Sequence, residues 1–188
     1  MKKIIITLTI ALVLMSNYTF AQIINQTDTK IVGGAASFAY TSTTEAYSSN
    51  VGQVQIVPLY GNFLNNQFFL GVAGNFQVTA SDYSSPDYIL AVSPLVRYYF
   101  ADNSFLGAEI GVGTSISGGE NTPLYLWNAT IGKDFPISKS VFLELALGYG
   151  KTYYEPDGGP AATASNLRLS FGVVATLGSN NAPNNVVF

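Results

Sequence analysis

The chain contains no histidine and no cysteine among its 188 residues. Without histidine it lacks the commonest general base, pH switch and metal ligand of proteins. Without cysteine it can form no disulfide, and it offers neither a thiol nucleophile nor the attachment residue of a lipoprotein. We therefore expect a protein that is not an enzyme and that carries no cofactor and no metal.

Charge is also scarce, because charged residues make up only 10% of the chain, against about 25% in an ordinary soluble domain. A water-facing surface needs more charges than this. Hydrophobic residues nevertheless reach only 48%, and no internal run approaches the roughly 20 apolar residues of a membrane helix. A membrane protein of this composition must satisfy its backbone by closing a sheet.

The N-terminus has the pattern of an export signal. Lys2 and Lys3 precede an apolar core at 4–14, and Thr19-Phe20-Ala21 resembles a signal-peptidase cleavage site. We predict a cleaved signal peptide at 1–21 and one domain at 22–188, because the apolar core is too short for an uncleaved anchor helix. Cleavage leaves six basic residues against 11 acidic ones, so nucleic acid is not an expected partner.

Eight strand-like segments follow, and most are longer than strands of soluble sheets. We expect them at 30–40, 51–61, 67–79, 88–100, 104–117, 123–134, 140–153 and 165–177. The links between them alternate between short and longer, which is typical of outer-membrane barrels with short periplasmic turns and longer external loops. The predicted fold is all-β: an eight-stranded antiparallel up-and-down transmembrane β-barrel with both termini in the periplasm.

The hairpin at 90–113 shows how the two faces of each strand differ. Leu90, Val92 and Val96 share one face of the first strand, whereas Arg97 lies on the other. A soluble lipocalin-like barrel would turn the apolar face inward and cover its exterior with charge. The polar faces here carry mostly glycine, alanine and serine, with far too few charges for an exterior. We therefore predict that the apolar face meets lipid, and keep a secreted soluble barrel as the less favoured alternative.

Aromatic residues gather at both ends of the expected strands, which predicts two girdles at the membrane interfaces. The girdle at the short-turn end comprises Phe63, Phe68, Phe69, Tyr98, Tyr99, Phe100, Phe105, Phe135 and Phe142. The girdle toward the long loops comprises Tyr40, Tyr83, Tyr88, Tyr125, Trp127, Tyr149, Tyr153 and Tyr154.

Four charged residues are expected to point into the lumen. A hairpin centred on Asn103 would place Arg97 nearly opposite Glu109, and Glu144 and Arg168 face inward on the last two strands in a register that the sequence leaves open. These residues could form a network that plugs or gates the barrel. They could also be a structural neutralisation, because buried charges need partners, and we favour that interpretation.

Two prolines lie inside the expected strands, although proline has no N–H to donate to a sheet ladder. We expect a bulge or a locally open ladder at Pro58 and at Pro94.

The signal peptide, the hairpin SPLVRYYFADNSFLGAEIGVG, its echo VPLYGNFLNNQFFLGVAG and the ending NLRLSFGVVATL resemble small outer-membrane barrels of the Bacteroidota type, which are OmpX- and OmpW-like. The resemblance implies insertion by the barrel-assembly machinery, which recognises the last strand. Ser170, Gly172, Ala175 and Leu177 match that signal loosely, whereas the chain continues to Phe188.

We expect a monomer in outer-membrane lipid with a structural, adhesive or surface-interaction role, its external loops contacting a ligand that the sequence does not identify. The OmpW resemblance implies an alternative, a narrow porin-like passage for small or apolar solutes. An eight-stranded barrel is only just wide enough for its own side chains, which disfavours a water-filled pore.

Overall fold

The computed structural model describes residues 29–42, 50–81, 84–155 and 162–177. The predicted signal peptide at 1–21 and the tail at 178–188 lie outside the described residues. Within the described parts of the chain, no helix is long and apolar enough to cross a membrane.

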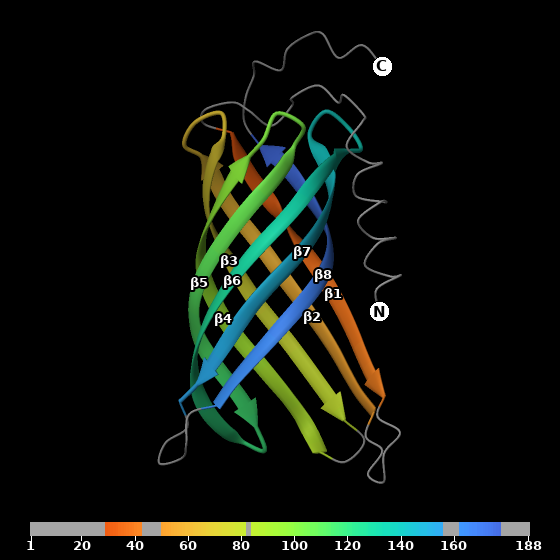
Figure 1. Cartoon of the computed structure of the whole chain (residues 1–188), viewed down its shortest axis with the longest axis vertical. Coiled ribbons are helices and arrows are strands. Elements are labelled where there is room, and N and C mark those ends of the chain that lie inside the picture. Colours follow the sequence, from red (N-terminus) through yellow and green to blue (C-terminus); the bar gives the residue numbers. More distant parts are fainter. Residues whose placement is uncertain (1–28, 43–49, 82–83, 156–161, 178–188) are drawn as a thin grey trace, which may run out of the picture.

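Eight antiparallel strands form one closed barrel in which each strand pairs with its neighbours in the sequence (Figure 1). The strands are β1 (Lys30–Ser42), β2 (Asn50–Phe63), β3 (Phe68–Ser81), β4 (Ser84–Tyr99), β5 (Ser104–Ser117), β6 (Glu120–Pro136), β7 (Val141–Tyr154) and β8 (Ala162–Leu177). Strand β1 also pairs with β8 and so closes the ring. The predicted eight-stranded up-and-down barrel is confirmed, and every predicted strand end lies within four residues of the observed one.

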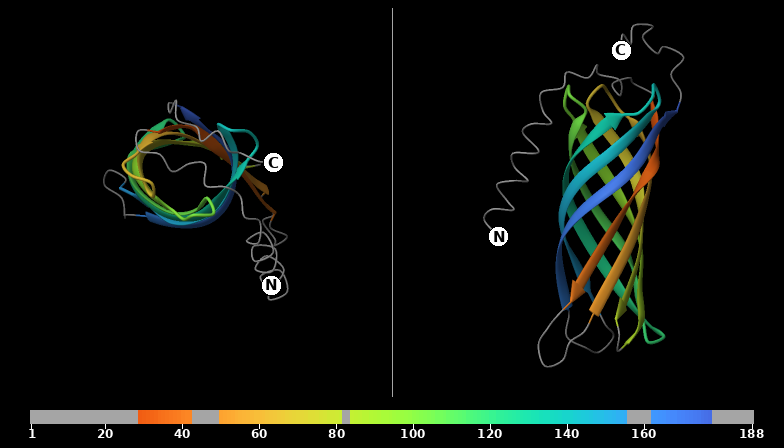
Figure 2. Two further views of the ribbon diagram at one scale, coloured as in Figure 1. Left: turned by 90° about the horizontal axis from the view of Figure 1, so that it is seen from above. Right: turned by 90° about the vertical axis from the view of Figure 1, so that its right-hand side faces the viewer.

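The strands extend further into two of the predicted links at the long-loop end than the sequence pattern indicated. Strands β3 and β4 are separated only by residues 82–83. Strands β5 and β6 are joined by Gly118 and Gly119, which adopt φ angles of 58° and 90°. Two successive positive φ angles suit a tight hairpin turn and favour glycine. The links β2–β3, β4–β5 and β6–β7 lie at the opposite end of the barrel, together with the start of β1 and the end of β8 (Figures 1 and 2).

Side chains alternate between the exterior and the interior, and the large apolar ones point outward as predicted. Each strand contributes at least one exposed apolar side chain to the exterior, among them Phe38, Ile56, Val72, Val92, Ile110, Ile131, Leu143 and Phe171. The buried core lies inside the barrel and contains Ile31, Leu59, Phe63, Phe69, Ala73, Leu95, Tyr99, Phe105, Phe142, Ala146 and Val174.

Both prolines leave the sheet ladder locally open, without a bulge. The β2–β3 pairing is interrupted between Ile56 and Leu59 and resumes in the same register. The β4–β5 pairing is likewise interrupted between Val92 and Leu95. Pro58 still pairs with Gly34 of β1, and Pro94 pairs with Val72 of β3. Each proline therefore turns the edge that lacks a donor toward one neighbour only, which confirms the open-ladder prediction.

The seam between the first and last strands is only half paired. Strands β1 and β8 pair over seven positions, from Lys30–Leu177 to Ala36–Phe171. Strand β1 pairs with β2 along its whole length, and β8 pairs with β7 from Ala162 to Ala175. The ribbons of β1 and β8 accordingly diverge toward the long-loop end (Figure 1). Beyond Ala36, the facing edges of β1 and β8 are not paired with each other in the described residues.

Glycine is required where strands β2 and β3 approach each other. Gly61 and Gly71 are directly paired, and the ring of Phe69 covers both. A Cβ atom on Gly61 would lie 2.3 Å from the backbone oxygen of Leu70 and 2.5 Å from the Cα atom of Gly71. These are backbone atoms, so a larger residue can fit only if the strands move.

We predict that Gly61→Ala lowers the free energy of unfolding by about 1–3 kcal/mol, the usual range for overpacking a filled interior. Gly107→Ala is the matched control, because its Cβ would lie 3.4 Å from the Cγ atom of Arg97, an ordinary contact. The measurement is urea unfolding in lipid vesicles, followed by the fluorescence of Trp127, the single tryptophan. Equal stability of the two variants would contradict this packing.

Candidate functional site

The shortest charged contact in the barrel interior joins Arg97 of β4 to Glu144 of β7. The Nη1 atom of Arg97 donates to Oε2 of Glu144 at 2.5 Å, and its Nη2 atom donates to Oε1 at 3.2 Å. The two side chains are only 11% and 5% exposed. A two-pronged guanidinium–carboxylate pair of this kind fixes both orientation and charge, so it braces two strands that are not neighbours in the sheet.

The predicted pairing of Arg97 with Glu109 is wrong. Arg97 lies opposite Gly107, and Glu109 lies opposite Leu95. Asn103 adopts a left-handed conformation with φ 61°, and its N–H donates to the backbone oxygen of Phe100 at 3.1 Å. This three-residue hairpin link centres the turn on residue 102 instead of Asn103 and so shifts the register.

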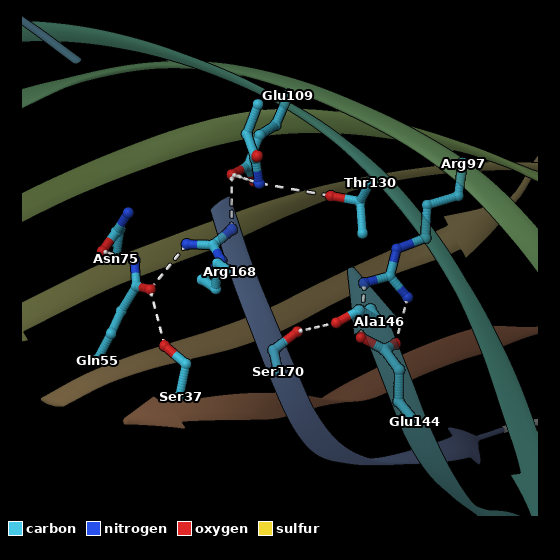
Figure 3. Close-up of polar contacts among 11 residues, drawn as sticks. Ser37, Gln55, Asn75, Arg97, Glu109, Thr130, Glu144, Ala146, Arg168 and Ser170 are labelled. Carbon is cyan, nitrogen blue, oxygen red and sulfur yellow. Dashed lines mark hydrogen bonds and ion pairs between the residues drawn. The ribbon is translucent and has the colours of Figure 1, made fainter. Parts of the chain in front are cut away.

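Glu109 instead lies near Arg168 of β8 (Figure 3). We call the Arg97–Glu144 pair the first polar layer, and the group around Glu109 and Arg168 the second. The Nη2 atom of Arg168 is 3.9 Å from Oε1 of Glu109, and its Nη1 atom donates to Oε1 of Gln55 at 2.8 Å. Gln55 in turn donates to Asn75 at 2.8 Å and accepts from Ser37 at 3.1 Å. Neutral amides and a hydroxyl therefore supply hydrogen bonds around this looser ion pair.

The Nδ2 atom of Asn128 completes this layer by donating to Oε1 of Glu109 at 3.2 Å. The two layers together contain one polar side chain from each strand, in the order Ser37, Gln55, Asn75, Arg97, Glu109, Asn128, Glu144 and Arg168. A cavity of about 50 Å³ touches both ion pairs. Such a volume holds roughly four water molecules, so the lumen here is a filled interior.

An aromatic cluster closes the lumen on the short-turn side of Arg97. It consists of Phe63, Phe69, Tyr99, Phe105 and Phe142, each at most 2% exposed. The guanidinium carbon of Arg97 lies 4.3 Å from the centre of the Phe105 ring, and Nη1 of Arg97 donates to the Tyr99 hydroxyl at 3.3 Å. The cluster therefore holds the inner face of the arginine while Glu144 neutralises it.

These five residues were predicted to lie in the short-turn girdle, and that prediction is wrong. Their strand positions have the inward parity of Arg97, Glu109 and Glu144, so the alternation already indicated that they point into the lumen. Phe68, Tyr98, Phe100 and Phe135 remain on the outward face. At the other end, four tyrosines are exposed as predicted: Tyr88, Tyr125, Tyr149 and Tyr153. Trp127 packs on Tyr149, whereas Tyr154 has inward parity. Tyr83 and the side chain of Tyr40 lie outside the described residues.

A separate ion pair lies outside the lumen at the β4–β5 turn. Nζ of Lys133 donates to Oδ2 of Asp102 at 3.0 Å, and the backbone and hydroxyl of Ser104 donate to Oδ1. Burial alone would raise the pKa of Asp102, but the hydrogen bonds from Ser104 and Lys133 outweigh it and lower the pKa to about 2. The carboxylate thus stays charged and holds the turn against β6.

Sequence reasoning missed the neutral polar partners and a further acid. Gln55 and Asn128 have the inward parity of their strands, and a search for amides on that parity would have found them. Asp134 of β6 is also inward and only 1% exposed. In the described part of the chain, no group of three or more acidic, histidine or cysteine residues could hold a metal ion.

Neither a family model nor a curated protein sequence matches the chain. Among solved structures it is similar to the outer membrane protein OprG from Pseudomonas aeruginosa, at 11% identity and a TM-score of 0.48, covering 85% of this chain and 100% of OprG. It is similar to Neisserial surface protein A at 17% identity and a TM-score of 0.47, covering 78% and 96%. A de novo designed transmembrane β-barrel gives 14% identity and a TM-score of 0.44, covering 81% and 98%. These similarities assign neither a family nor a function.

We predict that Arg97→Met lowers the free energy of unfolding by about 3–5 kcal/mol, because it leaves the carboxylate of Glu144 uncompensated in the lumen. Glu144→Gln should lower it as well, because it replaces the charged partner of both Arg97 hydrogen bonds. The double variant should cost less than the sum of the two. A matched cycle of Arg97→Met with Glu109→Gln should show weaker coupling. Stronger coupling of Arg97 to Glu109 than to Glu144, measured by urea unfolding in vesicles, would contradict the observed pairing.

Proposed function

We propose that the chain is a small outer-membrane β-barrel protein with a structural or surface-interaction role and no catalytic activity. The observation that carries the proposal is the exterior of the barrel, which presents apolar side chains from every strand. A water-soluble protein rarely exposes a continuous apolar surface of this extent. A closed barrel with an apolar exterior is also one of the few structures that a bilayer accepts.

The position of charge on the exterior supports this proposal. Among the residues of outward parity within the eight strands, the charged ones are Lys30 and Lys133 near the short-turn end and Lys151 toward the long-loop end. A 14-residue strand such as β2 rises roughly 35 Å at a tilt of about 40°. That height is enough to span the roughly 30 Å hydrocarbon core of a bilayer.

The lumen supports a role without a through-pore. The aromatic cluster fills the short-turn end, the two polar layers cross the middle of the barrel, and the cavity that touches both ion pairs is only about 50 Å³. Contacts with other molecules would then be made by the links at the long-loop end. We propose that this end faces outward from the cell, that the short turns are periplasmic and that residues 1–21 are a cleaved export signal.

We also propose a kind of barrel, partners and an oligomeric state for the chain. The residues quoted above favour a place among OmpX- and OmpW-like barrels of the Bacteroidota type. The expected partners are outer-membrane lipid and the barrel-assembly machinery during insertion, and the expected state is a monomer.

We predict that the purified protein shows heat-modifiable migration on gels after detergent extraction and no steady conductance in planar bilayers. Heat-modifiable migration shows that the barrel is folded. The same preparation is used for the conductance measurement, so that a lack of conductance cannot be due to unfolded protein. Stable single-channel steps from a heat-modifiable preparation would contradict a filled lumen. Recovery of the mature chain in the soluble periplasmic fraction would instead favour a secreted soluble barrel.

A narrow lateral passage for small or apolar solutes is the second candidate, and the half-paired β1–β8 seam favours it. On the lumen side of the seam lie Ser37 and Arg168. On its outer side lie Phe38 and Leu167, which are 72% and 73% exposed. Backbone groups left unpaired in hydrocarbon cost several kcal/mol each. The structural role therefore requires the seam to close in a bilayer, whereas a lateral passage requires it to open.

We predict that the variant Phe38→Cys with Leu169→Cys forms a disulfide in membranes. Continuing the observed β1–β8 register would bring these two outward positions together. Val32→Cys with Ala175→Cys is the matched control, because that pair is already in register and has the same parity. The chain has no other cysteine, so non-reducing gels report only the intended pair. A disulfide in the control alone would favour the lateral passage over the closed barrel.

A further inference from the structure

Asp134 is a buried acid that the two ion pairs leave without a partner. It is 1% exposed, lies directly opposite Glu144 in the β6–β7 pairing, and neither of its carboxyl oxygens has a hydrogen-bond partner. Its backbone N–H donates to the backbone oxygen of Asn103 at 3.1 Å. Its side chain is therefore held at the level of the β4–β5 turn, inside the closed end of the barrel.

The charges around Asp134 do not balance. The titratable groups that face it are Arg97 and Tyr99 from β4 and Glu144 from β7, and the turn adds the neutral amide of Asn103. Glu144 already uses both of its oxygens on Arg97. Ionised Asp134 would leave two neighbouring carboxylates with one guanidinium in an aromatic compartment. An uncompensated carboxylate is expensive in such surroundings.

The surroundings are too tight for a larger cation. Phe63, Phe69, Phe105 and Phe142 are almost fully buried at this end. The cavity between the polar layers is lined by Arg97 and Glu144 and not by Asp134. A proton is the one positive charge that can be added to the carboxyl group without any cavity.

We propose that Asp134 is a proton-binding site, whose carboxyl group keeps its proton in the folded barrel at neutral pH. With this proton in place, the net charge of Asp134, Glu144 and Arg97 together is zero. The protonated carboxyl group of Asp134 also has an O–H that can donate a hydrogen bond. Loss of the proton places a second negative charge beside Glu144 and weakens the closed end of the barrel. The inference is independent of what the barrel binds or conducts.

Infrared spectroscopy of the folded protein in vesicles at neutral pH tests the proposal directly. The carbonyl stretching band of a protonated carboxylic acid should be present in the wild-type protein and absent in Asp134→Asn. Asp102→Asn, which removes the carboxylate of the β4–β5 turn, is the matched control and should keep the band. Absence of the band from the wild-type protein, or its persistence in Asp134→Asn, would overturn the proposal.

A second variant tests the charge count. Glu144→Gln leaves Asp134 as the nearest carboxyl group for Arg97, so Asp134 should ionise and the band should disappear although residue 134 is unchanged. Persistence of the band in folded Glu144→Gln would show that Glu144 does not hold the proton on Asp134. That result would overturn the shared-charge account.

The stability of the barrel gives an independent readout. A carboxyl group that is protonated when folded and ionised when unfolded contributes stability that is complete below its unfolded pKa near 4 and is lost as pH rises. Between that pH and the pH at which the folded group loses its proton, each such proton changes the unfolding equilibrium constant about tenfold per pH unit. Between about pH 4 and neutral pH, the free energy of unfolding of the wild-type protein should therefore fall more steeply with pH than that of Asp134→Asn. The difference in slope should correspond to one bound proton. Equal slopes for the two proteins would contradict the proposal.

Discussion

The structure depends on how a narrow barrel accommodates charge in its interior. Eight strands leave room for little more than their own side chains, and an unpaired charge in that space is costly. Arg97 is neutralised by Glu144 across the lumen, and Arg168 is shared among Glu109, Gln55 and their neighbours. Because these contacts cross the lumen, they connect strands that the sheet itself does not pair. The charged layers therefore act as internal braces.

The two ends of the barrel differ because of what lies beside these layers. Toward the short turns, five aromatic rings fill the lumen and cover Arg97. Toward the long loops, amides and hydroxyls replace the rings, and the β1–β8 pairing stops at Ala36. The closed end is where buried charge needs the most support, and the half-paired seam is where the wall is weakest. Any molecule that enters the barrel would meet the polar half first.

The strands and their two faces were readable from the sequence, because alternation is a local property of a strand. Leu90, Val92 and Arg97 lie on the predicted faces of β4 for that reason. The hairpin register was not readable from alternation, since it depended on Asn103 adopting a left-handed conformation. A shift by two positions keeps every side chain on its predicted face, so the facial pattern gave no warning.

The partners of the charged residues could not be predicted from the chain order. Arg97 and Glu144 belong to strands that become opposite only when the barrel closes, so no spacing in the sequence encodes their contact. The aromatic cluster is different, because Tyr99 and Phe105 share the parity of Arg97 and Glu109. Their position near strand ends suggested an interface, while their parity indicated the lumen. Parity prevailed because filling a narrow interior requires large side chains there.

The central claim is that the apolar exterior faces lipid, and the single tryptophan allows a direct test. Trp127 has outward parity on β6 and packs against the exposed Tyr149, with ring centres 5.9 Å apart. The measurement is quenching of its fluorescence in vesicles by lipids brominated on the acyl chain, compared with quenching by aqueous acrylamide. The account predicts strong quenching by the brominated lipids and weak quenching by acrylamide. Strong quenching by acrylamide with none by brominated lipid would contradict it.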